Sequence, residues 1–276
     1  MDKKIQTEKM KTVLITGATD GIGKETAQRL AKKGWRVLIH GRSEKRCRDV
    51  LEKIRNVTGN SSIEYICADL ADFKDIYKIA EDVKKHFKTI AVLINNAGVF
   101  EPQQKFTLNG IELTFAVNHL AYFLLTGLLL DVLKQNTPAR IINVSSMAHA
   151  SRIDFDDLRG QKSYSGYKTY AQSKLANILF TFHLAEKLAD WGITVNCLHP
   201  GVTSTKLLHA GWGMGGNSVK QGAKTSVYLA SSPELEQTTG KYFIDSQITH
   251  PAGIANDRKV QERLWKISEA LCGYSY

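Results

Sequence analysis

The sequence predicts a single α/β domain built on a doubly wound parallel sheet of about seven strands. Short apolar runs rich in β-branched residues alternate with segments whose apolar residues recur every three or four positions. A glycine-rich turn joins the first of these runs to the first helical segment, and small or polar residues follow most of the later runs. No linker rich in Pro, Gly or Ser interrupts the 276 residues, so we expect one domain over residues 1–276.

The order of the elements predicts where a ligand would bind. The predicted strands are residues 12–16, 36–40, 63–67, 90–94, 140–144, 193–198 and 241–244. Helices are expected from residue 22, from about 111 to 135, from about 168 and from 218 to 230, whereas 151–167 and 207–217 are expected to be irregular. Ligands of open parallel sheets bind beyond the carboxyl ends of the strands, so the segments that follow these runs should form the site.

The charge balance is basic, with 37 Lys and Arg against 27 Asp and Glu and a net charge of +10. Such a balance could indicate a nucleic-acid partner or an anionic membrane surface. The basic residues are spread along the chain with acids among them, and no block of like charges forms. We therefore expect no nucleic-acid binding and interpret the charge as solvated helix faces together with a phosphate-bearing ligand.

The cysteines and the apolar runs bear on redox state and location. Cys47, Cys67, Cys197 and Cys272 are scattered, with no C-x-x-C pair, so we expect reduced thiols and no metal site. Residues 1–11 are charged, and no run approaches the roughly eighteen uninterrupted apolar residues of a membrane helix. These features predict a cytoplasmic protein with neither an N-terminal anchor nor a membrane span.

Residues 16–23, TGATDGIG, form the turn between the first strand and the first helix. Gly17 permits a tight turn, Gly21 lets a ligand approach the backbone, and Gly23 lets the helix pack close to the strand. The helix start would offer free N–H groups to a diphosphate. The same spacing also occurs in plain strand-to-helix turns.

The end of the second strand bears on which dinucleotide could bind. An acidic residue that binds the ribose is expected about twenty residues after such a turn, and none is present. Arg42 stands there instead, in the segment VLIHGRS at 37–43. An arginine can accept a 2′-phosphate, so NADP is favoured over NAD, unless Arg42 is an ordinary exposed arginine.

Residues 170–174, YAQSK, open a long segment with apolar residues at helical spacing. Tyr170 and Lys174 would be i,i+4 neighbours on one helix face. A phenol ionises at about pH 10, and an adjacent ammonium is expected to lower that pKa by about one unit or more, which would allow proton exchange with an alcohol or carbonyl oxygen. The spacing is also common on solvated helices, and Tyr164 with Lys168 repeats it, although Gly166 between them disfavours a helical pairing.

Two further polar residues stand next to apolar segments. Asn118 falls inside the helix predicted at 111–135 and must be hydrogen-bonded, either to tie that helix to a neighbour or as part of a site. His199 precedes Pro200 at the end of the sixth strand and is interpreted as a turn histidine rather than a ligand.

Together these motifs resemble the short-chain dehydrogenase/reductase family over nearly the whole chain. The shared features are TGxxxGIG at 16–23, NNAG at 95–98, Asn118, Ser146, YxxxK at 170–174 and Pro200-Gly201, in the family's order. The segments 118–120, 143–149 and 173–177 are most similar to the retinol dehydrogenase branch. The resemblance implies a Rossmann-type enzyme that moves a hydride between NADP(H) and a carbonyl/alcohol pair.

The resemblance also implies roles for individual residues. Tyr170 would be the acid/base, Lys174 would lower its pKa and hold the nicotinamide ribose, Ser146 would orient the substrate oxygen, and Asn118 would position a water in the proton relay. The implied cofactor-binding residues are Gly17, Thr19, Asp20, Gly21, Ile22, Gly23, Arg42, Asp69, Leu70, Asn96, Ala97, Gly98, Tyr170, Lys174, Pro200, Gly201, Thr203 and Thr205.

Within that set, Asp69 and Leu70 would flank the adenine, Asn96 the ribose and Thr205 the carboxamide. Asp20 is a departure, because many relatives have Ser or Thr there. Its carboxylate could cap the helix instead of facing the ligand.

The segment 203–217 is predicted to cover the substrate. It contains Leu207, Leu208, Trp212 and Met214, and its glycines at 211, 213, 215 and 216 would ease its movement. As a lid it implies a small apolar aldehyde or ketone, or the matching alcohol, although it could also be a surface loop whose Trp212 packs locally.

Two other hypotheses concern the whole protein. A non-catalytic NADP(H)-binding sensor or scaffold is the alternative function, and the complete Asn, Ser, Tyr and Lys set argues against it. A homo-oligomer is possible.

Overall fold

An eight-stranded sheet runs through the molecule in the order β3-β2-β1-β4-β5-β6-β7-β8. The computed structural model describes residues 10–162 and 164–276, so most of the predicted charged segment 1–11 lies outside the described residues. The strands are β1 Thr12–Ile15, β2 Arg36–Gly41, β3 Ile63–Cys67, β4 Val92–Asn95, β5 Ala139–Val144, β6 Ile193–His199, β7 Lys241–Ile244 and β8 Gln247–Thr249. All pairs are parallel except β7 with β8.

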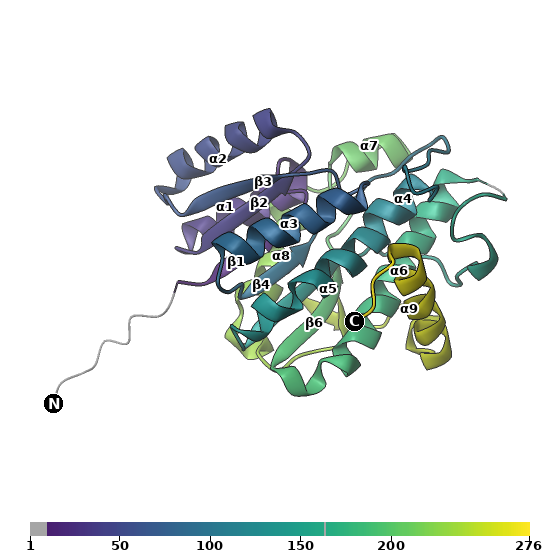
Figure 1. Cartoon of the computed structure of the whole chain (residues 1–276). Helices are drawn as coiled ribbons and strands as arrows, with labels where there is room; N and C mark the ends of the chain where they lie inside the picture. The colour runs from purple at the N-terminus through teal and green to yellow at the C-terminus, as the bar shows by residue number, and fades with distance from the viewer. Residues whose placement is uncertain (1–9, 163) are drawn as a thin grey trace.

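Helices cover both faces of this sheet (Figure 1). They are α1 Gly21–Lys32, α2 Glu44–Thr58, α3 Phe73–His86, α4 Leu113–Phe115, α5 Ala121–Lys134, α6 Gly166–Lys187, α7 Lys206–Trp212, α8 Val219–Ser231 and α9 Arg258–Cys272. Helices α1, α2 and α8 pack together on one face, and α3, α5, α6 and α9 on the other. The predicted α/β fold is confirmed.

The sheet has an eighth strand that the sequence analysis did not predict. β8 is antiparallel to β7 and adds three residues at the edge. Asp245 and Ser246 form the two-residue turn between them, both with positive φ, 48° and 64°. Positive φ at both central positions is the geometry of tight hairpins, which Asn-Gly or Asp-Gly signals more clearly than Asp-Ser.

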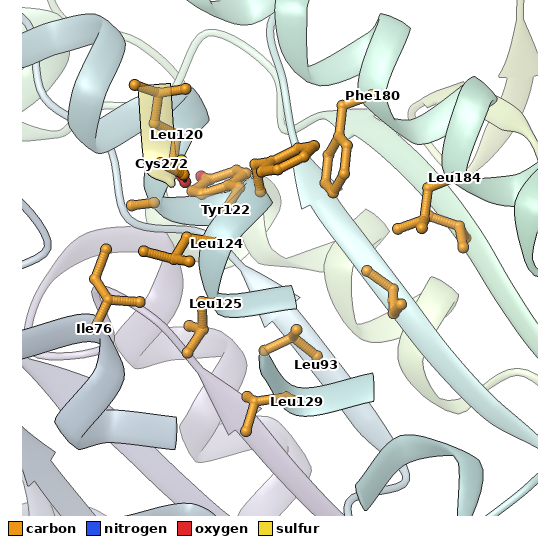
Figure 2. Close-up of a cluster of buried hydrophobic side chains, with 14 of the residues drawn as sticks. Ile76, Leu93, Leu120, Tyr122, Leu124, Leu125, Leu129, Phe180, Leu184 and Cys272 are labelled. Carbon is orange, nitrogen blue, oxygen red and sulfur yellow. The ribbon is translucent and has the colours of Figure 1, made fainter. Parts of the chain in front are cut away.

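The stretch Leu113–Lys134 lies at the centre of the larger core. It is apolar enough, at a mean hydropathy of 1.7, and long enough to cross a membrane, but 89% of its most apolar window is buried inside this fold. Figure 2 shows leucines of this stretch between Ile76 of α3, Leu93 of β4 and Phe180 of α6. Its apolar character is therefore accounted for by packing between layers.

Strand β1 is the point at which the sheet's order reverses, because it pairs with both β2 and β4. The chain winds outward from β1 to β3 on one side and from β4 to β7 on the other. Ligands of such sheets bind at this reversal, outside the carboxyl ends of the strands. The turn that follows β1 and the end of β4 are therefore the centre of the candidate site.

Candidate active site

A cavity of about 920 Å³ extends along the carboxyl edge of the sheet. Its walls come from the ends of β1 to β6, the start of α1 and helix α7. Every residue that the sequence analysis proposed for the site lines this cavity, with the exception of Asn118. The lining residues so predicted are Gly17, Thr19, Asp20, Gly21, Ile22, Gly23, Arg42, Asp69, Leu70, Asn96, Ala97, Gly98, Ser146, Tyr170, Lys174, Pro200, Gly201, Thr203 and Thr205.

The turn after β1 has no room for a side chain at Gly17 or Gly23. Gly17 has a φ of 63°, and a Cβ there would lie 2.7 Å from the Cα of Ala97. A Cβ on Gly23 would lie 2.5 Å from Nδ2 of Asn96. That amide donates hydrogen bonds to the backbone oxygens of Thr16 and Gly17, so the end of β4 braces the turn. The start of α1 is thereby held at the middle of the cavity.

The end of the cavity beside β2 and β3 is basic. Arg42 and Arg46 are exposed, line the cavity, and form no ion pair with any described residue. Arg42 was predicted from the sequence, whereas Arg46, the third residue of α2, was not. Arg46 could have been found from its position four residues after Arg42, which suggests that the two side chains lie near each other at the start of a helix. Two uncompensated guanidinium groups at this end suit a phosphate.

His40 is a second residue that the sequence analysis missed. It is buried in β2, and its Nδ1 accepts a hydrogen bond from Gly17 N at 3.3 Å. Its Nε2 lies 3.1 Å from Ala68 O and donates to it in that tautomer. Burial lowers the pKa of His40 to about 4, so the ring is neutral and links the glycine turn to the end of β3. A polar residue near the end of an apolar strand was the available signal.

Ser146, Tyr170 and Lys174 meet at the other end of the cavity. Ser146 follows β5, and both other residues lie on α6, which begins at Gly166 with Ser165 as its N-cap. Lys174 Nζ donates to Val144 O at 3.0 Å and lies 5.6 Å from the centre of the Tyr170 ring. Only 5% of Tyr170 and 2% of Lys174 are exposed. The predicted i,i+4 pair thus faces the cavity from within the core.

The predicted lowering of the Tyr170 pKa is wrong in this structure. Burial raises the pKa of Tyr170 to about 12, although a hydrogen bond with Ser146 acts in the opposite direction. Burial also lowers the pKa of Lys174 to about 7. The low dielectric penalises the charged form of each group, and a partly neutral amine has less charge with which to stabilise a phenolate.

We expect Lys174 to make the stability of the protein depend on pH. The pKa of Lys174 falls from 10.5 to about 7 on folding, so the unfolded chain binds more protons between these values. The free energy of unfolding should therefore be highest above pH 10.5, the pKa of Lys174 in the unfolded chain, and should decrease as the pH falls toward 7. Denaturant unfolding at about pH 7 and about pH 9 should show a smaller rise in stability for Lys174→Met than for the wild type.

Lys168→Met is the matched control, because Lys168 lies on the same helix but is half-exposed and pairs with Asp154 on the surface. It should keep the pH dependence of the wild type. An unchanged pH dependence in Lys174→Met would show that Lys174 titrates normally despite its burial.

Asn118 lies behind the cavity wall, in a π-helical segment, Ala116–Leu120, between α4 and α5. Its Oδ1 accepts from Val99 N at 2.8 Å, and its Nδ2 donates to Val99 O and to Ser173 Oγ, both at 3.0 Å. The side chain thus ties this segment to the loop after β4 and to α6. The structure thus shows Asn118 linking its helix to neighbouring segments, one of the two roles expected from the sequence. Its positioning of a relay water stays a prediction.

The second Tyr-x-x-x-Lys pair does not reach the site. Tyr164 precedes α6, and its hydroxyl donates to the backbone oxygen of Glu101. Lys168 instead forms an ion pair with Asp154 at 3.0 Å. Neither Tyr164 nor Lys168 lines the cavity, as expected from Gly166 between them.

The segment 207–217 is not as loose as predicted, because residues 207–212 belong to helix α7. Thr205 Oγ1 caps this helix by accepting from Leu208 N at 3.2 Å, and the helix ends at Gly213 with a φ of 61°. Gly211 lies inside it, where a Cβ would be 3.3 Å from the ring of Phe100. The glycines do not indicate a loose loop here, because Gly211 permits close packing and Gly213 ends the helix.

Trp212 closes an aromatic cluster over Tyr170. Its ring centre lies 5.5 Å from those of Tyr170 and Phe100 and 5.9 Å from that of Tyr167. Phe100 lies 5.9 Å from Tyr170 and was not singled out in the sequence. These contacts place the last residue of α7 directly above the proposed acid/base.

His199 is the last residue of β6 rather than part of a turn. It is buried and lines the cavity, and its Nδ1 has no hydrogen-bond partner among the described residues. Burial lowers its pKa to about 4, so the ring is neutral.

The cavity fits a dinucleotide. Its basic end lies beyond β2 and β3, the glycine turn and the start of α1 form its middle, and the Tyr170 group forms its far end. Gly17 and Gly21 present no side chain there, which leaves part of the turn's backbone open to a diphosphate on the helix start.

The sequence model of the short chain dehydrogenase family matches residues 11–212. The chain belongs to this family. Retinol dehydrogenase 12 of Mus musculus is 43% identical to this short-chain dehydrogenase, over 96% of the chain and 87% of that relative. Retinol dehydrogenase 14 of Homo sapiens is 38% identical, over 95% of the chain and 86% of its own length. The predicted resemblance is confirmed.

Solved structures agree with this assignment. An uncharacterized protein from Mycobacterium Paratuberculosis superposes with a TM-score of 0.81 and 31% identity, over 96% of this chain and 94% of its own. A short chain dehydrogenase from Burkholderia cenocepacia J2315, in complex with NADP, has a TM-score of 0.68 and 28% identity, over 90% and 98% of the two chains. This short-chain dehydrogenase is an NAD(P)-dependent oxidoreductase.

Proposed function

We propose that this short-chain dehydrogenase interconverts an apolar aldehyde or ketone and its alcohol, with NADP(H) as the preferred cofactor. The observation that carries the proposal is the convergence of Ser146, Tyr170 and Lys174 at one end of a dinucleotide-sized cavity, under an aromatic cover. A non-catalytic sensor would need no buried proton donor there. A cytoplasmic location stays a prediction of the sequence.

Tyr170 is suited to act as the proton donor. With a pKa of about 12 it is protonated at neutral pH, and its hydroxyl can give a proton to a carbonyl oxygen as negative charge develops there. Ser146 lies beside it and can donate a hydrogen bond to the same oxygen. A bound nicotinamide supplies or accepts the hydride. Lys174, fixed by Val144 O at 3.0 Å, would hold the adjoining ribose.

The basic end of the cavity supports the preference for NADP(H). Arg42 and Arg46 line it without ion-pair partners among the described residues. A phosphate on the adenosine ribose would supply the missing negative charge, whereas the plain ribose of NAD would not. The complex of the Burkholderia cenocepacia relative with NADP agrees with this assignment.

The cover over Tyr170 supports an apolar substrate. The cavity wall there includes Leu207, Leu208, Trp212 and Met214 of the 203–217 segment together with Leu113 and Val117. Each Å² of apolar surface removed from water by such a wall stabilises a bound chain by about 25 cal/mol. The relatives named as retinol dehydrogenases take their names from an apolar alcohol of this class.

Consumption of NADPH in the presence of a panel of aldehydes and ketones tests the proposal. The panel should contain straight-chain members of increasing length, an aromatic aldehyde and a retinoid aldehyde. We expect turnover that improves with apolar size. Binding of NADPH without turnover of any member would favour the sensor over the enzyme.

Trp212→Gly should raise KM for long-chain carbonyls roughly tenfold, the equivalent of losing about 55 Å² of apolar contact, and change KM for short ones little. The ring of Trp212 stands 5.5 Å from Tyr170, where the chain of a bound carbonyl would lie. The affinity for NADPH should stay unchanged. Steady-state kinetics over the straight-chain series gives both values.

Trp191→Gly is the matched control, because Trp191 precedes the opposite, amino end of β6 and does not line the cavity. It should leave the chain-length profile of the wild type intact. Equal effects of Trp212→Gly on short and long substrates would mean that the 203–217 segment does not touch the substrate.

A further inference from the structure

Helix α7 touches the glycine turn as well as the aromatic cluster. Lys206, its first residue, forms an ion pair with Asp20, with Nζ and Oδ2 2.7 Å apart. Next to it, Cγ2 of Thr205 lies 3.4 Å from the point where a Cβ on Gly21 would be. All four residues line the cavity. The start of α7 therefore closes over the part of the cavity where a diphosphate would bind.

The two ends of the segment that carries α7, residues 203–204 and 216–217, are hydrogen-bonded to each other and form its base. Thr203 and Asn217 form an isolated parallel bridge, and Ser204 Oγ accepts from Gly216 N at 2.7 Å. None of the seven residues of α7 is buried. The base is thus hydrogen-bonded, while the helix above it contacts the rest of the protein through Gly211 and Trp212 at one end and through Lys206 at the other. Such a unit can swing as a body about its base.

Asp20 is unfavourably placed for a phosphate-binding turn. It is the N-cap of α1, and its Oδ1 accepts from Gly21 N at 2.8 Å, so it occupies one of the N–H groups of the helix start. Its carboxylate would repel a diphosphate on the same helix start. Lys24 and Lys206 are the cations near it, and Lys206 alone is in direct contact among the described residues.

We propose that Asp20 and Lys206 form a charge latch that couples movement of α7 to release of the dinucleotide. With α7 closed, Lys206 neutralises Asp20 and the turn accepts phosphates. With α7 open, the carboxylate is left uncompensated beside the phosphates and speeds their departure. The two are positioning residues, and the inference rests on the proposed binding of NADP(H) in this cavity.

The test is a double-mutant cycle of Asp20→Asn and Lys206→Met. Asparagine keeps the capping oxygen while removing the charge. The readouts are the dissociation rate of NADPH, by stopped-flow fluorescence, and its Kd at low and high salt. In the wild-type background, Lys206→Met should speed dissociation by about threefold to fivefold, the upper range for an exposed ion pair. In the Asp20→Asn background the same substitution should have almost no effect.

High salt should shrink the effect of Lys206→Met, because both side chains are more than half exposed, at 76% and 57%. Lys84→Met, which breaks the exposed pair of Lys84 on α3 with Asp131 on α5, removes the same net charge away from the cavity and should leave dissociation unchanged. An equal effect of Lys206→Met in both backgrounds would show that Lys206 acts on the phosphates directly and would overturn the latch. So would unchanged dissociation in every variant. If the wild type bound neither NADPH nor NADH, the proposed function would fail, and the latch with it.

Discussion

Tyr170→Phe should lower kcat for carbonyl reduction by about 10²- to 10⁴-fold, the usual contribution of a positioned acid. The change removes one hydroxyl and keeps the ring that packs against Phe100 and Trp212, at 5.9 and 5.5 Å between ring centres. The Kd of NADPH should therefore remain within about twofold of the wild-type value, since little contact surface is lost. Single-turnover kinetics with saturating NADPH separates the chemical step from binding.

Tyr164→Phe is the matched control, because it removes the same hydroxyl from the other Tyr-x-x-x-Lys pair. Tyr164 lies outside the cavity, and its hydroxyl donates to the backbone oxygen of Glu101. Turnover should stay near the wild-type level. Survival of turnover in Tyr170→Phe, or its loss in Tyr164→Phe alone, would show that the acid has been assigned to the wrong tyrosine.

Arg42→Ala should reduce the preference for NADP(H) over NAD(H) by roughly tenfold to a hundredfold. A charge-assisted hydrogen bond contributes about 1.5–3 kcal/mol, and each 1.4 kcal/mol corresponds to about tenfold. Arg42 has no carboxylate partner among the described residues, so its guanidinium is free to bind a 2′-phosphate. The loss should fall on kcat/KM with NADPH and spare the value with NADH.

Arg48→Ala is the control for the cofactor experiment. Arg48 lies on the same helix as Arg46 but bonds to Glu44 and Tyr65 and does not line the cavity. It should leave the cofactor ratio unchanged. Equal values of kcat/KM with NADH and NADPH in the wild-type enzyme would contradict the proposed preference, whatever the variants did.

Local patterns in the sequence were sufficient for most of the fold. Apolar spacing placed seven of the eight strands, and the helical stretches that begin at Gly21, Leu113, Gly166 and Val219, within a few residues of their observed bounds, whereas α2, α3 and α9 were not placed. β8 and α7 were missed, because three residues after an Asp-Ser turn, or seven residues rich in glycine, make too weak a periodic signal. Most site residues were predicted from the resemblance to the family, and they come together because the carboxyl ends of parallel strands meet at one edge.

By itself the sequence determined the chemistry available to this protein, a tyrosine and a lysine one helical turn apart, a glycine turn that can approach a diphosphate, and an arginine in place of a ribose-binding acid. Only the tertiary structure decided how those groups behave. It raised the pKa of Tyr170 to about 12 and lowered that of Lys174 to about 7, because burial penalises charge whatever the spacing along the chain. It likewise brought Lys206 to Asp20, 186 positions away, since only folding sets the distance between charges on separate segments.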